Sequence, residues 1–209
     1  MIVSNVWEKT INCNWKSFWE NFNECLHCPN VHPELTQLVP MFTRRIINPQ
    51  DLSGWVPKTK ESDPKFSGGL KKGAQTWSED GHAQGCQINS LSDSDLLKGH
   101  VYASSWPSVF IGGYADHIRI VRVTPTESEK VTITSEWLFE EETLKNENYD
   151  RENVISFACR VMEQDALACE LNQKGIHSSP YQNGVLMPEE YVIKKFHDWL
   201  RGQLKTPKI

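Results

Sequence analysis

Two histidines and two acidic residues in this chain have types and spacing that could bind a metal. Glu24, His27 and His32 fall within nine residues, Pro29 lies between the histidines, and Asp165 is far along the chain. Two imidazoles and one carboxylate on one side of a metal are the protein ligands of mononuclear non-haem Fe(II) sites that activate dioxygen. The sequence predicts such a site if the chain brings His27, His32 and Asp165 together.

Asp165 interrupts the apolar stripe of a predicted helix at about residues 151–174. On a helical wheel it lies about 20° from Ala158. A buried carboxylate needs a cation, a hydrogen-bond network or a proton. A metal is one answer, and a buried arginine, Arg119 or Arg122, is the other; periodicity does not choose between them. The stripe consists of Val154, Ala158, Val161, Met162 and Cys169.

The two histidines could converge only if the chain changes direction between them. On an ideal helix His27 and His32 lie about 140° apart. An apolar stripe predicts a helix from about residue 15 to 27, with Asn14 as its N-cap. Pro29 lacks an N–H and disfavours helical geometry in the residue before it, so we expect the helix to end near His27 and His32 to face back. The stripe contains Trp15, Phe18, Trp19 and Phe22.

Glu24 lies one turn before His27, hence on nearly the same side of the predicted helix. It could be a fourth ligand, a partner that orients an imidazole, or an exposed glutamate. Cys25, Cys28 and His32 suggest a rival, because their spacing occurs in small zinc modules. Such modules usually occur in chains too small to fold otherwise, whereas 209 residues can bury a core, so iron ranks above zinc.

Composition narrows the classes of partner. The formal net charge is −5 and the pI is about 5.8, with lysine and arginine scattered, which argues against nucleic acid or an anionic membrane as the main partner. No apolar stretch approaches the roughly 20 residues that span a bilayer. The N-terminus lacks a signal-peptide pattern. We therefore expect a cytoplasmic protein whose six cysteines are thiols.

The remaining periodicity predicts a sheet between helices. Strand signals dominate from about residue 73 to 140, most clearly in 117–123 and 131–139, which read as an antiparallel hairpin with one buried face. A short helix is expected at about 188–204, and residues of about 48–72 read as a long irregular segment. Helices at both ends of an antiparallel sheet predict a single α+β domain with a long C-terminal helix lying across the sheet.

Two segments that carry these residues resemble the iron-binding regions of a known family. Asn14–Glu34 and Glu163–Gly175, the latter followed by Ser178–Tyr181, are similar to the large subunit of Rieske-type non-haem iron oxygenases, with a weaker match at Ser135–Phe139. The pattern Glu-Cys-x-His-Cys, with glutamate at position 24, resembles the branch that acts on quaternary amines such as choline, glycine betaine and carnitine more than the ring-dioxygenase branch. The implied fold is a helix-grip, START-like domain.

The resemblance implies a role for each site residue. His27, His32 and Asp165 would ligate Fe(II), and Glu24 would hydrogen-bond a histidine of the neighbouring subunit's Rieske cluster and so bridge electron transfer. Electrons would pass from NAD(P)H through a reductase and the [2Fe–2S] cluster, with O2 as co-substrate and a homotrimer as the full-length assembly. A small quaternary amine would be N-demethylated, whereas an arene, the alternative substrate, would give a cis-diol.

One part of the family pattern is missing. The Rieske domain carries C-x-H and C-x-x-H pairs, and no C-x-x-H occurs in this sequence. We therefore expect residues 1–209 to be the catalytic domain alone, without the N-terminal Rieske domain and inactive by itself. Met1 falls close before the matching region, which favours truncation over a cluster on a separate chain or a loss of redox function. A non-catalytic ligand-binding module of the same shape is a further alternative.

Aromatic side chains are the substrate-pocket candidates, because a quaternary ammonium favours aromatic faces. For any one of them, a place in the core is the simpler interpretation. The candidates are Trp106, Tyr114, Trp137 and Phe139.

Overall fold

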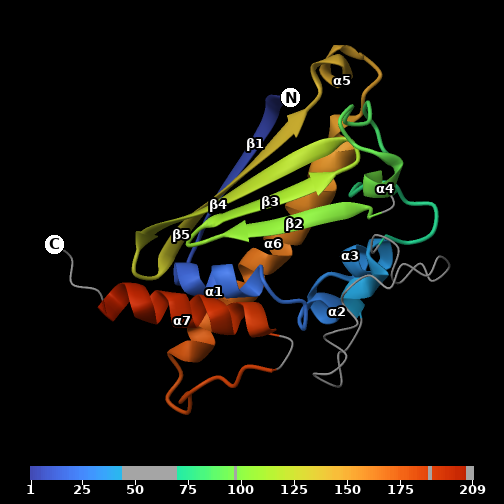
Figure 1. The fold of residues 1–209 in the computed structure, drawn as a ribbon. Coiled ribbons are helices and arrows are strands. Elements are labelled where there is room, and N and C mark those ends of the chain that lie inside the picture. Colours follow the sequence, from blue (N-terminus) through green and yellow to red (C-terminus); the bar gives the residue numbers. More distant parts are fainter. Residues whose placement is uncertain (44–69, 97, 188–189, 206–209) are drawn as a thin grey trace.

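The computed structural model describes residues 1–43, 70–96, 98–187 and 190–205. An antiparallel sheet of five strands in the order β1-β5-β4-β3-β2 forms the centre of this part of the chain (Figure 1). All neighbouring strands pair antiparallel, which confirms an antiparallel sheet. The strands expected from about residue 73 begin only at His100, because the described residues between 73 and 99 form turns and one short helix instead. The strands are β1 (Ile2–Ile11), β2 (His100–Ser105), β3 (Val109–Tyr114), β4 (His117–Glu127) and β5 (Lys130–Phe139).

The β4–β5 hairpin has the buried face that its alternation predicts. The side chains of Val131, Ile133, Ser135, Trp137 and Phe139 are all buried, while those between them are half-buried. The two strands are longer than predicted, because pairing continues to Glu127 opposite Lys130. Sequence patterns missed β1, whose apolar Val3 and Val6 are exposed, so that its hydrophobic pattern does not follow its burial.

One long helix, α6 (Arg151–Ile176), crosses one face of the sheet, as the helix-grip prediction requires (Figure 1). Its Val154, Ala158 and Met162 share a hydrophobic core with the inward side chains of β5. The predicted terminal helix is α7 (Tyr191–Lys205), whose Phe196 stacks on Trp19 with ring centroids 3.9 Å apart. The other helices are α1 (Trp15–Asn21), α2 (Cys28–Val31), α3 (Pro33–Leu38), the 3₁₀ helix η1 (Pro40–Thr43), α4 (Asp93–Leu96) and α5 (Glu141–Lys145).

The first helix is shorter than predicted, and the role assigned to Pro29 is wrong. Helix α1 begins after Asn14, whose side chain accepts a hydrogen bond from the backbone N–H of Lys16 as an N-cap should, but it ends at Asn21. Pro29 lies in the first turn of α2. A proline there removes no helical hydrogen bond, because the first N–H groups of a helix have no partner anyway.

Of the irregular segment predicted at residues 48–72, the structure describes only residues 70–72; the rest lies outside the described residues. Across the described helices, none is long and apolar enough to cross a membrane.

Candidate metal centre

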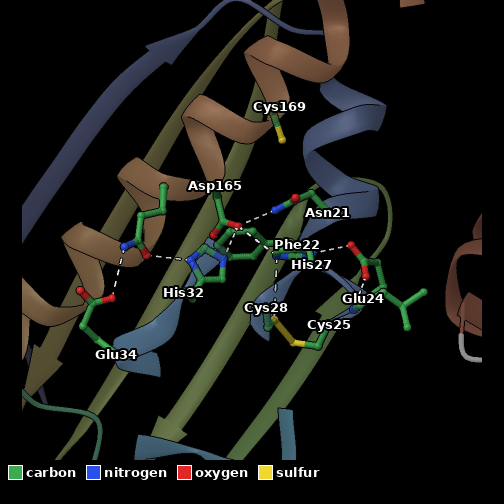
Figure 2. A network of polar contacts seen from close by, with 12 residues as sticks. Asn21, Phe22, Glu24, Cys25, His27, Cys28, His32, Glu34, Asp165 and Cys169 are labelled. Atoms are coloured by element: carbon green, nitrogen blue, oxygen red, sulfur yellow. Dashed lines mark hydrogen bonds and ion pairs between the residues drawn. A yellow bond between two sulfur atoms is a disulfide. The ribbon is translucent and has the colours of Figure 1, made fainter. Parts of the chain in front are cut away.

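The structure brings His27, His32 and Asp165 together at one point (Figure 2). Asp165 Oδ1 lies 2.9 Å from His32 Nε2 and 3.4 Å from His27 Nε2. The two imidazole rings have their centroids 5.1 Å apart and stand nearly perpendicular, at 78°. Three potential ligand side chains therefore face one another although Asp165 is 133 residues from His32 in sequence.

Two short helices turn the histidines toward the long one. His27 precedes α2 as its N-cap, and His32 lies between α2 and α3, where its backbone leaves helical geometry at φ −124° and ψ 67°. Pro33 then begins α3. The change of direction at His32 lets its imidazole face Asp165 on α6, so the convergence arises from a break between helices rather than from a helix that stops at Pro29.

Each imidazole is held through its other nitrogen. His27 Nδ1 is 2.5 Å from Glu24 Oε1, and His32 Nδ1 is 2.8 Å from Gln164 Oε1 (Figure 2). Because both partners offer oxygen acceptors, each Nδ1 carries the proton and donates it, and the Nε2 atoms are the ones directed at Asp165. An Nε2 that carries a proton as well donates it to Asp165 Oδ1, and an Nε2 without one has its lone pair available to a metal.

Asp165 is buried, with 3% of its surface exposed, and an amide also contacts it. Asn21 Nδ2 donates a 2.6 Å hydrogen bond to Asp165 Oδ1. The alternative of an arginine partner is wrong for the described residues: Arg122 pairs with Glu136 on the surface, and Asp165 forms ion pairs with the two histidines only. Sequence reasoning gave no role to Asn21 or Gln164, although both lie inside the matching segments, close to the ligands.

Protonation in this cluster follows from burial and mutual attraction. Burial opposes the charge on Asp165, but the hydrogen bonds from His27 and His32 outweigh it and lower the pKa of the carboxyl. Burial also opposes a charged His27, yet Asp165 and Glu24 outweigh it and raise the pKa of that imidazole to about 9. Without a metal the cluster thus holds a proton at neutral pH, and a metal ion would take its place.

The donor atoms fit a divalent metal. Two ligands at right angles, each about 2.1 Å from a metal, lie about 3.0 Å apart, which is close to both observed separations from Asp165 Oδ1. Two imidazole nitrogens and one carboxylate oxygen form the ligand set of non-haem Fe(II) sites that keep open positions. The cluster also borders a cavity of about 420 Å³, which provides room beside those positions.

Two cysteines beside His27 are joined in a disulfide, which corrects the expectation of six thiols. The Cα atoms of Cys25, just before α2, and Cys28, the first residue of α2, lie 4.9 Å apart, a separation typical of disulfides. Cys13, Cys86, Cys159 and Cys169 are free. The zinc hypothesis weakens as well: the Cys28 sulfur lies 3.9 Å from His27 Nε2, but in the disulfide it is not a free thiolate.

The four aromatic residues predicted for the substrate pocket do not line this cavity. Trp137 and Phe139 are fully buried in the main core, Tyr114 lies in a second core cluster, and Trp106 packs against Trp199. Strand alternation shows that a side chain faces inward, but not where the inner face is left uncovered. Residues that do line the cavity, besides the metal cluster, include Phe22, Trp77, His100, Tyr102 and Arg119.

A sheet gripped by a long helix, with two histidines and an aspartate meeting beside a cavity, is the arrangement that the resemblance to non-haem iron oxygenases predicted. The chain belongs to the family of ring-hydroxylating alpha subunits. Residues 3–206 match the model of that family's catalytic domain.

Sequence relatives lie in the quaternary-amine branch, as the resemblance predicted. The glycine betaine monooxygenase oxygenase subunit of Pseudomonas aeruginosa is 25% identical over 210 residues, covering 89% of this chain and 48% of the relative. The chloroplastic choline monooxygenase of Atriplex hortensis is 24% identical over 200 residues, covering 95% and 39%. The chain therefore spans about half the length of the curated relatives it matches, or less.

Solved structures share the fold. A quaternary ammonium Rieske monooxygenase superposes with a TM-score of 0.60 at 13% identity, over 96% of this chain and 50% of that one. Naphthalene 1,2-dioxygenase from Rhodococcus sp. superposes with a TM-score of 0.56 at 14% identity, over 98% and 57%. At such identities the similarity shows the fold alone, which both branches share.

Proposed function

We propose that the chain is the oxygen-activating domain of a Rieske-type monooxygenase that hydroxylates an N-methyl group of a small quaternary amine. His27, His32 and Asp165 would hold Fe(II), which supplies the activation of dioxygen when bound. The observation that supports this most directly is the approach of both Nε2 atoms to Asp165 Oδ1, at 3.4 and 2.9 Å, beside a cavity.

The surrounding side chains hold this centre in place and receive the substrate. Glu24 and Gln164 accept the Nδ1 protons and so fix both ring orientations. Phe22, Trp77 and Tyr102 line the cavity with aromatic surface. Aromatic faces exclude water and attract a quaternary ammonium, by about 2 kcal/mol when it is desolvated.

The reaction balances as a monooxygenation. One oxygen atom of O2 enters a C–H bond of the N-methyl group, and the other leaves as water after taking up two electrons and two protons. The resulting carbinolamine loses its hydroxyl proton as its C–N bond breaks, giving formaldehyde and the demethylated amine. In this reaction the protein would hold the N-methyl group beside the open positions of the metal and exclude water from the cavity.

The electrons must come from elsewhere, because the sequence lacks a second pair of cluster ligands. We propose that residues 1–209 act as the catalytic domain with a [2Fe–2S] Rieske domain, a reductase and NAD(P)H, in a homotrimer. Glu24 is the proposed electron bridge, since its carboxylate binds His27 Nδ1 and remains 14% exposed.

Metal analysis tests the proposal. The chain loaded anaerobically with Fe(II) is expected to retain one iron per chain after gel filtration, and Asp165→Asn and His32→Ala are expected to lose it. His197→Ala is the matched control, because His197 pairs with Glu20 away from the cluster and should leave iron unchanged.

Two outcomes would contradict this assignment. Stoichiometric iron in Asp165→Asn would exclude that carboxylate as a ligand. Retention of zinc rather than iron, lost in Cys25→Ser under reducing conditions, would support the zinc-stabilised module instead.

A further inference from the structure

A buried arginine in the cavity has no acidic partner among the residues that the structure describes. Arg119 on β4 is 4% exposed, and its Nε and Nη1 atoms have no hydrogen-bond partner. Arg122, three residues along the same strand, shows the ordinary arrangement, because its guanidinium pairs with Glu136 at the surface. In the described part of the chain, no carboxylate lies within ion-pair distance of Arg119.

The strand direction explains why Arg119 points inward. Along β4 the side chains of His117, Arg119, Val121 and Val123 are buried and those of Ile118 and Ile120 are half-buried, so Arg119 shares the inner face that borders the cavity. Its guanidinium carbon lies 5.7 Å from the centroid of the Trp77 ring. This contact makes a buried cation tolerable, but it satisfies no N–H donor.

A buried guanidinium without an anion lowers the stability of a fold, but it can bind an anionic ligand. Arginine presents its N–H groups as a planar fork that matches a carboxylate in two parallel hydrogen bonds. Burying the cation without an anion destabilises the chain, and a bound carboxylate would remove that penalty.

We propose that Arg119 is the substrate-binding residue for a carboxylate. Resting on the proposed function, this makes the substrate a betaine, in which one molecule carries a quaternary ammonium and a carboxylate. The same cavity is lined by the aromatic Phe22 and Tyr102, which suit the ammonium, and by the cationic Arg119, which suits the carboxylate. A quaternary amino alcohol such as choline would leave the guanidinium unpaired.

Calorimetric titration of the metal-loaded chain tests this assignment without measuring turnover. The ligands are glycine betaine, γ-butyrobetaine and benzoate, each compared with its methyl ester, which removes the negative charge. At least one acid is expected to bind about tenfold or more tightly than its ester, as hydrogen bonds to a charged group allow. Arg119→Gln is expected to abolish that preference, and Arg122→Gln to preserve it.

The outcomes separate the inference from the proposed function. Preference for benzoate over its ester, dependent on Arg119, with no binding of either betaine would retain the carboxylate site and overturn the quaternary-amine substrate. Three results would overturn the carboxylate site. They are equal affinity for each acid and its ester, an acid preference that survives in Arg119→Gln, and no binding of any of the three acids.

Thermal melting distinguishes a ligand site from a structural role. Because the unpaired cation is unfavourable, ligand-free Arg119→Gln is expected to melt no lower than the unmodified chain. A lower melting temperature together with an unchanged acid preference would assign Arg119 to the fold and overturn the proposal. If Arg119→Gln does not fold, Arg119→Lys serves instead: it keeps the charge, loses the planar fork, and is expected to lose most of the acid preference.

Discussion

The individual side chains of the centre are arranged in pairs: one faces the proposed metal position and the other holds the first in its orientation. His27 is held by Glu24, His32 by Gln164, and Asp165 receives the amide of Asn21. Such supporting contacts set ring orientation and tautomer, and their loss typically lowers metal affinity 10–100-fold.

Gln164→Leu tests the support of His32. The substitution removes the acceptor for His32 Nδ1 while leaving all three proposed ligands, so we expect metal affinity to fall about 10–100-fold. Competition against a fluorescent chelator measures it. Glu163→Gln is the control, because Glu163 lies next to Gln164 on α6 but is exposed and pairs with Lys9 of β1. Equal affinity in Gln164→Leu and the control would refute a supporting role.

Glu24→Gln separates metal binding from electron delivery. The amide oxygen can still accept the His27 proton, so iron is expected to stay bound. With the Rieske partner and reductase present, we expect turnover to fall about 100-fold or more, as when a positioned proton and charge carrier is removed. Iron content and NADH-coupled product formation are measured on the same sample. Normal turnover would remove Glu24 from the electron path.

Among the elements, helix α6 serves both the core and the centre. Its inward side packs Met162 into the core with no exposed surface, and one turn on the same side presents Asp165 to the histidines. The packing of α6 on the sheet therefore fixes the position of the Asp165 carboxylate.

Truncation of Met162 tests that packing. Met162→Ala leaves a cavity in the core, so we expect the free energy of unfolding to fall by about 2–5 kcal/mol. Leu167→Ala on the same helix removes a side chain that is 60% exposed and is expected to change it by less than about 0.5 kcal/mol. Urea unfolding measures both. A similar loss in the two variants would mean that α6 does not pack as described.

For the whole molecule, two histidines with opposite shifts shape stability in the metal-free chain. The pKa of His27 is raised to about 9, so its contribution is fully present below about pH 6.5 and is lost as the pH rises toward 9. Burial lowers the pKa of His117 despite its hydrogen bond to Asp116, so protonation below about pH 6.5 favours the unfolded chain. Asp116 and Asp165, whose pKa values are lowered, lose their contributions only below about pH 4.

We therefore expect the stability of the metal-free chain to peak near about pH 6.5. Urea unfolding in the presence of a chelator, from about pH 5 to 9, measures the curve. His117→Gln should flatten only the acid side and His27→Gln only the alkaline side. An acid side that stays as steep in His117→Gln would show that His117 does not carry the effect.

Much of the fold could be predicted because its signals are local. The period of 3.6 residues located α6, and the alternation at residues 131–139 located β5 and its buried face. Helix α1 and the turn after it could be predicted only in part, since α1 ends at Asn21, before any proline, and Pro29 begins α2. Strand β1 was missed because its Val3 and Val6 are exposed, so its apolar residues do not mark its buried face.

The sequence by itself determined the residue types of the centre, since a carboxylate within an apolar stripe must have a partner wherever the helix lies. Only the tertiary structure decided that the partners of Asp165 are His27, His32 and Asn21 rather than an arginine. It also decided which inward side chains border a cavity, placing Arg119 there and Trp137 in the core. The reason is that periodicity records the direction of a side chain, whereas a cavity depends on how separate elements pack.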